Sequence, residues 1–120
     1  MQSFPSSAPA IGLIGPGNVG RALLGQLAQA ASRHGGGGLR LHAIANSRRM
    51  RIAPQAFDDA EKTLEDGEAL DLPHFAAHLH ALHPAPTLIV DCSGSDAVAA
   101  HYADWLAAGI HVVTPNKQAG

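Results

Sequence analysis

A glycine-rich segment near the start of the chain constrains the fold more than any other feature of the sequence. Residues 15–20 read GPGNVG, and they stand between the apolar run Ala10–Ile14 and a segment in which apolar residues recur every three to four positions. The run predicts a buried strand, and the periodic segment predicts a helix. GxGxxG is a weak signal alone. Between a strand and a helix, in the first βα unit, it is typical of dinucleotide-binding α/β domains.

The rest of the chain alternates between predicted strands and helices. We expect strands at 10–14, 39–45, 87–91 and 110–114, and helices at 19–34, 71–82 and 96–108. Residues 48–70 have the weakest pattern, and there Pro54 to Glu65 are expected to form a helix that stops at Asp66-Gly67. This alternation predicts a single α/β domain over residues 10–120, a Rossmann-like doubly wound parallel sheet, after a disordered leader at residues 1–9.

Two of the predicted helices carry recognisable apolar faces. In the first helix the apolar positions Val19, Leu23, Leu27 and Ala31 recur every four residues, with Ala22, Leu24 and Ala30 beside them. In the last helix Val98, Tyr102, Trp105 and Leu106 lie on roughly one side. Helices that bury one such face pack against a sheet.

Composition agrees with this class and limits the function. Of the 120 residues, 46% are hydrophobic but only 4% aromatic, which suits helices on a parallel sheet better than an aromatic-rich sandwich. A net charge of −2 argues against nucleic acid as the default partner, and no stretch approaches a membrane span. The lone Cys92 excludes an intrachain disulfide, and the first ten residues do not resemble a signal peptide, so we expect a cytoplasmic location.

Each glycine of the turn has its own physical role. Gly15 makes the tight turn, Gly17 lets a pyrophosphate approach the backbone, and Gly20 lets the helix lie close to the sheet. The helix N-terminus then offers N–H groups and positive potential to the phosphates. The alternative is a tight turn that binds no ligand.

The residues after the second strand bear on the choice of nucleotide. An acidic residue there would accept hydrogen bonds from a free ribose 2′-hydroxyl, but the chain has Asn46, Ser47, Arg48 and Arg49. Because a guanidinium matches a phosphate, the sequence favours NADP over NAD. The alternative is that both arginines are solvated loop charges.

Two later strand ends supply further candidates, because ligands of open α/β sheets bind beyond the carboxyl ends of the strands. Ser93 is expected beside the ribose and nicotinamide, or as a cap for the next helix, or both. Lys117, after the fourth strand, is expected to hold an anionic substrate or polarise a carbonyl; the alternative is an exposed lysine.

Together these segments resemble homoserine dehydrogenase, especially the dehydrogenase portion of the bifunctional aspartokinase–homoserine dehydrogenases. The resemblance runs from about Ala10 to the last residue, is weakest over residues 48–84, and is carried by GPGNVG, IANSR, VDCSGSDAV, HYADWLAAGIHVV and TPNK. It implies NAD(P)-dependent interconversion of homoserine and aspartate 4-semialdehyde, on the route to threonine and methionine.

The resemblance also implies roles for individual residues. It places the pyrophosphate at Gly15, Gly17, Asn18, Val19 and Gly20, the 2′-phosphate at Ser47 and Arg48, the ribose or nicotinamide at Ser93, and substrate and nicotinamide at a catalytic Lys117. Ser93-Gly94-Ser95 departs from the family, whose members more often have threonine first and no glycine. A substrate and dimerisation domain with the acid–base groups follows in the family. We therefore expect this chain to be inactive alone and the full-length protein to be a homo-oligomer through that domain.

The sequence leaves other functions open and contains other candidate sites. The alternatives are a stand-alone dinucleotide-sensing module and the cofactor domain of another aspartate-pathway reductase. His74 and His78 lie four residues apart, as metal ligands on a helix can, with His80 and His83 nearby, but no third ligand is evident, so we expect no metal. Cys92 is expected to be a small buried thiol rather than a nucleophile.

Overall fold

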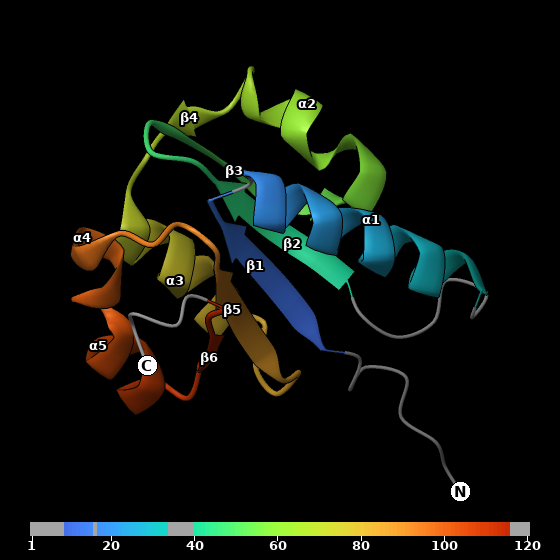
Figure 1. The fold of residues 1–120 in the computed structure, drawn as a ribbon. Coiled ribbons are helices and arrows are strands. Elements are labelled where there is room, and N and C mark those ends of the chain that lie inside the picture. Colours follow the sequence, from blue (N-terminus) through green and yellow to red (C-terminus); the bar gives the residue numbers. More distant parts are fainter. Residues whose placement is uncertain (1–8, 16, 34–39, 116–120) are drawn as a thin grey trace, which may run out of the picture.

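The computed structural model describes residues 9–15, 17–33 and 40–115, and they form one small α/β domain around a six-stranded sheet (Figure 1). The strand order is β4-β3-β2-β1-β5-β6. The parallel part consists of β1 (Ala10–Ile14), β2 (Arg40–Ala45), β5 (Thr87–Asp91) and β6 (His111–Val113). The two remaining strands, β3 (Arg49–Gln55) and β4 (Glu68–Ala69), are antiparallel and extend one edge. The predicted α/β class is confirmed, with a sheet that is mostly parallel.

Helices cover both faces of the sheet (Figure 1). On one face, α1 (Asn18–Arg33), the short 3-10 helix η2 (Phe57–Asp59) and α2 (Ala60–Leu64) enclose a core that includes Ile11, Leu13, Leu24, Ile44, Phe57 and Leu64. On the other face, α3 (Leu72–His80), α4 (Asp96–Ala99) and α5 (Tyr102–Ala107) enclose Ala43, Phe75, Leu79, Ile89, Val98 and Trp105. None of the helices within the described ranges is long and apolar enough to cross a bilayer.

The expected helix from Pro54 to Glu65 was wrong over its first three residues. Pro54 lies in β3, and helical structure begins only at Phe57, although the chain does turn at Asp66-Gly67 as expected. Proline cannot donate to a ladder and is tolerated at strand edges. The strand β4 pairs with Arg49 and Met50 alone, so Pro54 lies beyond the paired part of that edge.

The expected helix over residues 96–108 is divided in two. A turn at Ala100-His101 separates α4 from α5, so helical spacing does not continue across it. Val98 and Trp105 are buried as expected, but Leu106 is 57% exposed.

The expected buried face of the first helix was wrong at one position. Val19 in α1 is 56% exposed, whereas Gly20 and Leu24 face the sheet. The helical spacing of α1 is confirmed at its other positions, since Leu24 is buried and Leu23 and Leu27 are partly buried against the same core.

Candidate functional site

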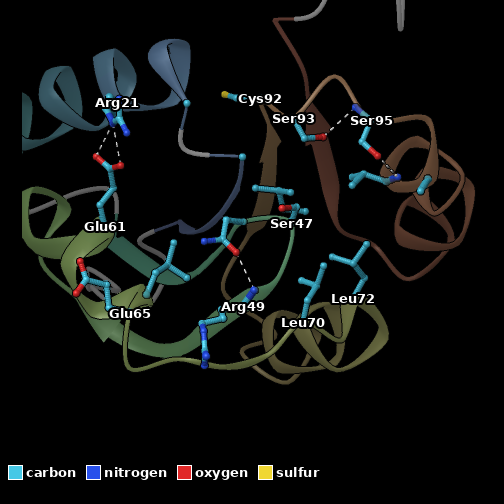
Figure 2. Close-up of a pocket in the computed structure, with 17 residues that line it drawn as sticks. Arg21, Ser47, Arg49, Glu61, Glu65, Leu70, Leu72, Cys92, Ser93 and Ser95 are labelled. Carbon is cyan, nitrogen blue, oxygen red and sulfur yellow. Dashed lines mark hydrogen bonds and ion pairs between the residues drawn. The ribbon is translucent and has the colours of Figure 1, made fainter.

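The carboxyl ends of β1, β2 and β5 open into one cavity of about 790 Å³ (Figure 2). Three turns contribute to its wall, with Gly15 and Gly17 after β1, Asn46, Ser47 and Arg49 after β2, and Cys92, Ser93 and Ser95 after β5. Sequence reasoning had assigned Gly15, Gly17, Ser47 and Ser93 to a shared site, and the fold brings them together. The volume lies within the range of small-molecule sites.

The glycine turn is packed closely at two of its glycines and open at the third. Gly15 has a φ of +80°, and a Cβ on it would lie 2.6 Å from the Cα of Ser93. A Cβ on Gly20 would lie 2.7 Å from the carbonyl oxygen of Gly15, whereas a Cβ on Gly17 would meet nothing within 4 Å. Asn18 and Val19 are exposed in the first turn of α1, directly after this open position.

The turn after β2 is fixed by Asn46. Its Oδ1 accepts hydrogen bonds from the backbone N–H groups of Arg48 at 2.8 Å and Arg49 at 2.7 Å. This geometry turns the chain directly into β3, so that Arg49 lines the cavity and donates from Nη1 to the carbonyl of Gly67 at 2.9 Å. Arg48 is exposed and is not among the residues that line the cavity, although sequence reasoning had favoured it over Arg49.

The helix α2 adds charged residues that sequence reasoning missed. Glu61 and Glu65 line the cavity, and the Nε–H of Arg21 donates one bifurcated hydrogen bond to the two carboxylate oxygens of Glu61, at 2.9 and 3.1 Å. Both partners are partly exposed, so the stability gained from this ion pair is small. The signal in the sequence was the acidic run from Asp58 to Asp71, which could not be placed without the fold of residues 48–70.

A buried carboxylate organises the turn after β5. Asp91 is 1% exposed, and its Oδ1 accepts hydrogen bonds from the Ser93 N–H at 2.9 Å and the Ser93 hydroxyl at 2.5 Å. Its Oδ2 accepts a hydrogen bond from the hydroxyl of Tyr102. Burial, with the hydrogen bond and charge of Asp91, raises the pKa of Tyr102 to about 12, so this hydroxyl keeps its proton. In the sequence, the feature that could have pointed to this role is the position of Asp91, an acidic residue at the end of an apolar strand.

Ser93 and Ser95 form the second half of that turn. The Ser93 hydroxyl accepts a hydrogen bond from the Ser95 N–H at 3.1 Å, and the Ser95 hydroxyl accepts one from the Val98 N–H at 3.3 Å. The cap of α4 is therefore Ser95 and not Ser93, which answers one of the alternatives left open by the sequence.

Cys92 lines the same cavity and is partly buried. Burial first, and then the neighbouring Asp91, raise the pKa of its thiol. The thiol therefore stays protonated near neutral pH, and a protonated thiol is a poor nucleophile.

The histidines of α3 do not gather around one point. His74 is exposed, with Nδ1 3.9 Å from Glu68, whereas the ring of His78 lies 6.4 Å from that of His42 in β2. Within residues 9–15, 17–33 and 40–115, no group of three or more His, Cys, Asp or Glu residues could hold a metal ion. Lys117, the predicted catalytic residue, lies outside the described residues.

Comparison with known proteins connects this cavity to a family. The family model described as "Homoserine dehydrogenase, NAD binding domain" matches residues 15–120. The chain is 42% identical over 92% of its length to a bifunctional aspartokinase/homoserine dehydrogenase of Zea mays, and 40% identical over 92% to one of Daucus carota. It covers 13% of each of these relatives.

A solved structure agrees in fold. The homoserine dehydrogenase of Thermoplasma acidophilum superposes with a TM-score of 0.67 and 24% identity, over 92% of this chain and 35% of that one. At this identity the likeness concerns the fold alone. The family match extends over all three turns of the cavity, the glycine turn among them. This chain therefore belongs to the NAD-binding domain family of homoserine dehydrogenase, a family that binds a nicotinamide dinucleotide.

Proposed function

We propose that the chain binds NADP(H) in this cavity, as the cofactor domain of an enzyme that interconverts homoserine and aspartate 4-semialdehyde. The observation that carries the proposal is the convergence of three turns on one cavity beside the N-terminus of α1. The open space at Gly17 fits a pyrophosphate at the backbone, and the close packing at Gly20 fits the role of that glycine in seating the helix.

The phosphates of the cofactor would lie at two of the turns. Gly15, Gly17, Asn18, Val19 and Gly20 would hold the pyrophosphate, where backbone N–H groups and the helix dipole favour negative charge. Ser47 and Arg48 would hold the 2′-phosphate. To these we add Arg49, which lines the cavity.

The nicotinamide half would lie toward the turn after β5. Ser93 would contact the ribose or the nicotinamide, and Lys117 would contact substrate and nicotinamide together. Bound NADP(H) supplies the hydride chemistry, and the protein holds it in position. The acid–base groups of the reaction would belong to a substrate domain, through which the full-length protein would be a homo-oligomer.

Calorimetric titration of this chain with NADPH and with NADH tests the proposal. Arg48→Ala and Arg49→Ala are compared with Arg51→Ala, which removes the same charge from an exposed position on β3. A lost phosphate contact, at about 1.5–3 kcal/mol, should raise the Kd for NADPH roughly 10- to 100-fold, with no change for Arg51→Ala. Equal affinities for NADPH and NADH would contradict the preference for NADP, and binding of neither would contradict the proposal itself.

NAD is a second candidate cofactor, because Glu61 and Glu65 line the same cavity and carboxylates repel a phosphate. The enzymatic proposal is tested on the full-length protein by homoserine-dependent reduction of NADP. Absence of that activity would favour a dinucleotide sensor or the cofactor domain of another aspartate-pathway reductase. The cytoplasmic location stays a prediction, and the relative from Zea mays is named as chloroplastic.

A further inference from the structure

The hydroxyl of Ser93 has a fixed polarity, set by the groups around it. A serine hydroxyl can donate one hydrogen bond and accept two. The Ser95 N–H, which can only donate, occupies one acceptor position at 3.1 Å. The hydroxyl donates its one hydrogen bond to Asp91 Oδ1 at 2.5 Å, because a carboxylate oxygen can only accept. The same oxygen also accepts the Ser93 N–H at 2.9 Å, so it accepts two hydrogen bonds from Ser93.

Asp91 is itself held in one orientation. Asp91 is 1% exposed and lies at the end of β5. Its second oxygen accepts a hydrogen bond from the hydroxyl of Tyr102, the first residue of α5. Thr114, directly after β6, also interacts with the Tyr102 hydroxyl. Rotation of the carboxylate would break the hydrogen bonds to Ser93 and Tyr102 together, so Oδ1 is held in place as the acceptor for the Ser93 hydroxyl.

One acceptor position of Ser93 is left, and Ser93 lines the cavity (Figure 2). We propose that Asp91 is a positioning residue that makes Ser93 a pure hydrogen-bond acceptor, so that this point of the cavity takes a donor group of the cofactor. On the nicotinamide half, the donors are the carboxamide NH₂ and the ribose hydroxyls. A phosphate or a carbonyl oxygen would find no proton there. The inference rests on the proposed function, which places the nicotinamide half at this turn.

The experiment compares NADPH with its 3-acetylpyridine analogue, in which a methyl group replaces the carboxamide NH₂. Calorimetry on the chain should show the analogue binding about 3- to 10-fold more weakly than NADPH, as expected for one lost hydrogen bond. In Ser93→Ala the two affinities should become equal. In Ser93→Thr, which keeps the hydroxyl, the difference should persist.

Variants at position 91 test whether the binding preference depends on the direction of the Ser93 hydrogen bond, on the negative charge of Asp91, or on loss of folding. Asp91→Ala frees the Ser93 proton, so the preference for NADPH over the analogue should be lost. Asp91→Asn should keep the preference, because the amide oxygen can accept from Ser93 while its NH₂ donates to the Tyr102 oxygen. Asp104→Ala, which removes an exposed acidic residue of α5, is the charge control and should change nothing. If Asp91→Ala does not fold, the Ser93 variants still decide.

The outcomes show whether the cofactor group that donates to Ser93 is the carboxamide or the ribose. They also distinguish failure of this inference from failure of the proposed function. If only analogues that lack a hydroxyl of the nicotinamide ribose lose affinity, and Ser93→Ala removes that loss, the donor is the ribose. Equal binding of NADPH and all these analogues by the unaltered chain would overturn the inference while leaving the proposed function intact. An unchanged preference in Ser93→Ala would overturn it too. No binding of NADPH at all would overturn the proposed function, and this inference with it.

Discussion

Replacing Gly20 by alanine should destabilise the domain, whereas the same change at Gly25 in the same helix should stabilise it. At Gly25 a Cβ would meet nothing within 4 Å, so alanine gains about 0.8–1 kcal/mol of helix propensity. At Gly20 the Cβ would lie 2.7 Å from the Gly15 carbonyl oxygen. That backbone cannot move freely, because the carbonyl accepts from the Gly17 N–H and the Gly15 N–H donates to Ala45, both at 2.8 Å.

The magnitude follows from these two terms. Overpacking costs about 1–3 kcal/mol, and a blocked backbone places Gly20→Ala in the upper half of that range. Since Gly20 lies in the first turn of α1, where propensity matters less, the compensating gain is below about 1 kcal/mol. We therefore expect a free energy of unfolding lower by about 1–3 kcal/mol, and a separation of about 2–4 kcal/mol from Gly25→Ala.

Urea denaturation of the three proteins, analysed with a common m-value, measures this separation. Thermal melts should agree, with roughly 4 °C for each kcal/mol in a chain of this length. If Gly20→Ala were as stabilising as Gly25→Ala, the close approach between α1 and the glycine turn would not exist in solution, and the assigned role of Gly20 would be refuted.

Two further predictions concern the α3 side of the sheet. Burial, followed by neighbouring positive charge, lowers the pKa values of His42 and His78 below 6.5, so the unfolded chain binds protons first as the pH falls. These two histidines should therefore leave the free energy of unfolding unaffected well above pH 6.5 and lower it as the pH falls through 6.5. Melts from about pH 8 to about pH 5 should show a smaller decline in the His42→Gln/His78→Gln double variant, and an unaltered decline in that variant would contradict this assignment. Asp71 caps α3 by accepting a hydrogen bond from the backbone N–H of His74 at 3.0 Å. Asp71→Ala should therefore lower the free energy of unfolding, measured by urea denaturation, by about 1 kcal/mol, and an unchanged midpoint would show that the cap contributes nothing.

The elements that the sequence predicted well are those with a strong local pattern. The glycine turn, β1, α1 and β5 each combine an apolar period with a clear boundary, and the structure contains all of them. The strand β3 alternates Arg49, Met50, Arg51 and Ile52, but Pro54 suggested a helix start instead. The strand β4 has two residues and forms only because β3 lies beside it, so no local signal could reveal it.

The same distinction applies to the site. Gly15, Gly17, Ser47 and Ser93 could be predicted, because strand ends in parallel sheets converge at one edge. The contact between Asp91 and Tyr102 could not, since it joins residues 11 apart and depends on where the chain turns between α4 and α5. The presence of Arg49 in the cavity wall follows from the antiparallel β3, and that strand was not expected.

The contact between Gly15 and Ser93 has a consequence for directed evolution of this domain. The atoms that exclude a side chain from position 15 are the Cα and backbone nitrogen of residue 93, which every amino acid carries. A library that randomises both positions together should therefore return glycine alone at 15, with no compensating partner at 93. Exchange at position 93 would instead be limited by its own hydrogen bonds to Asp91, so the two neighbours would be constrained independently and show no covariation.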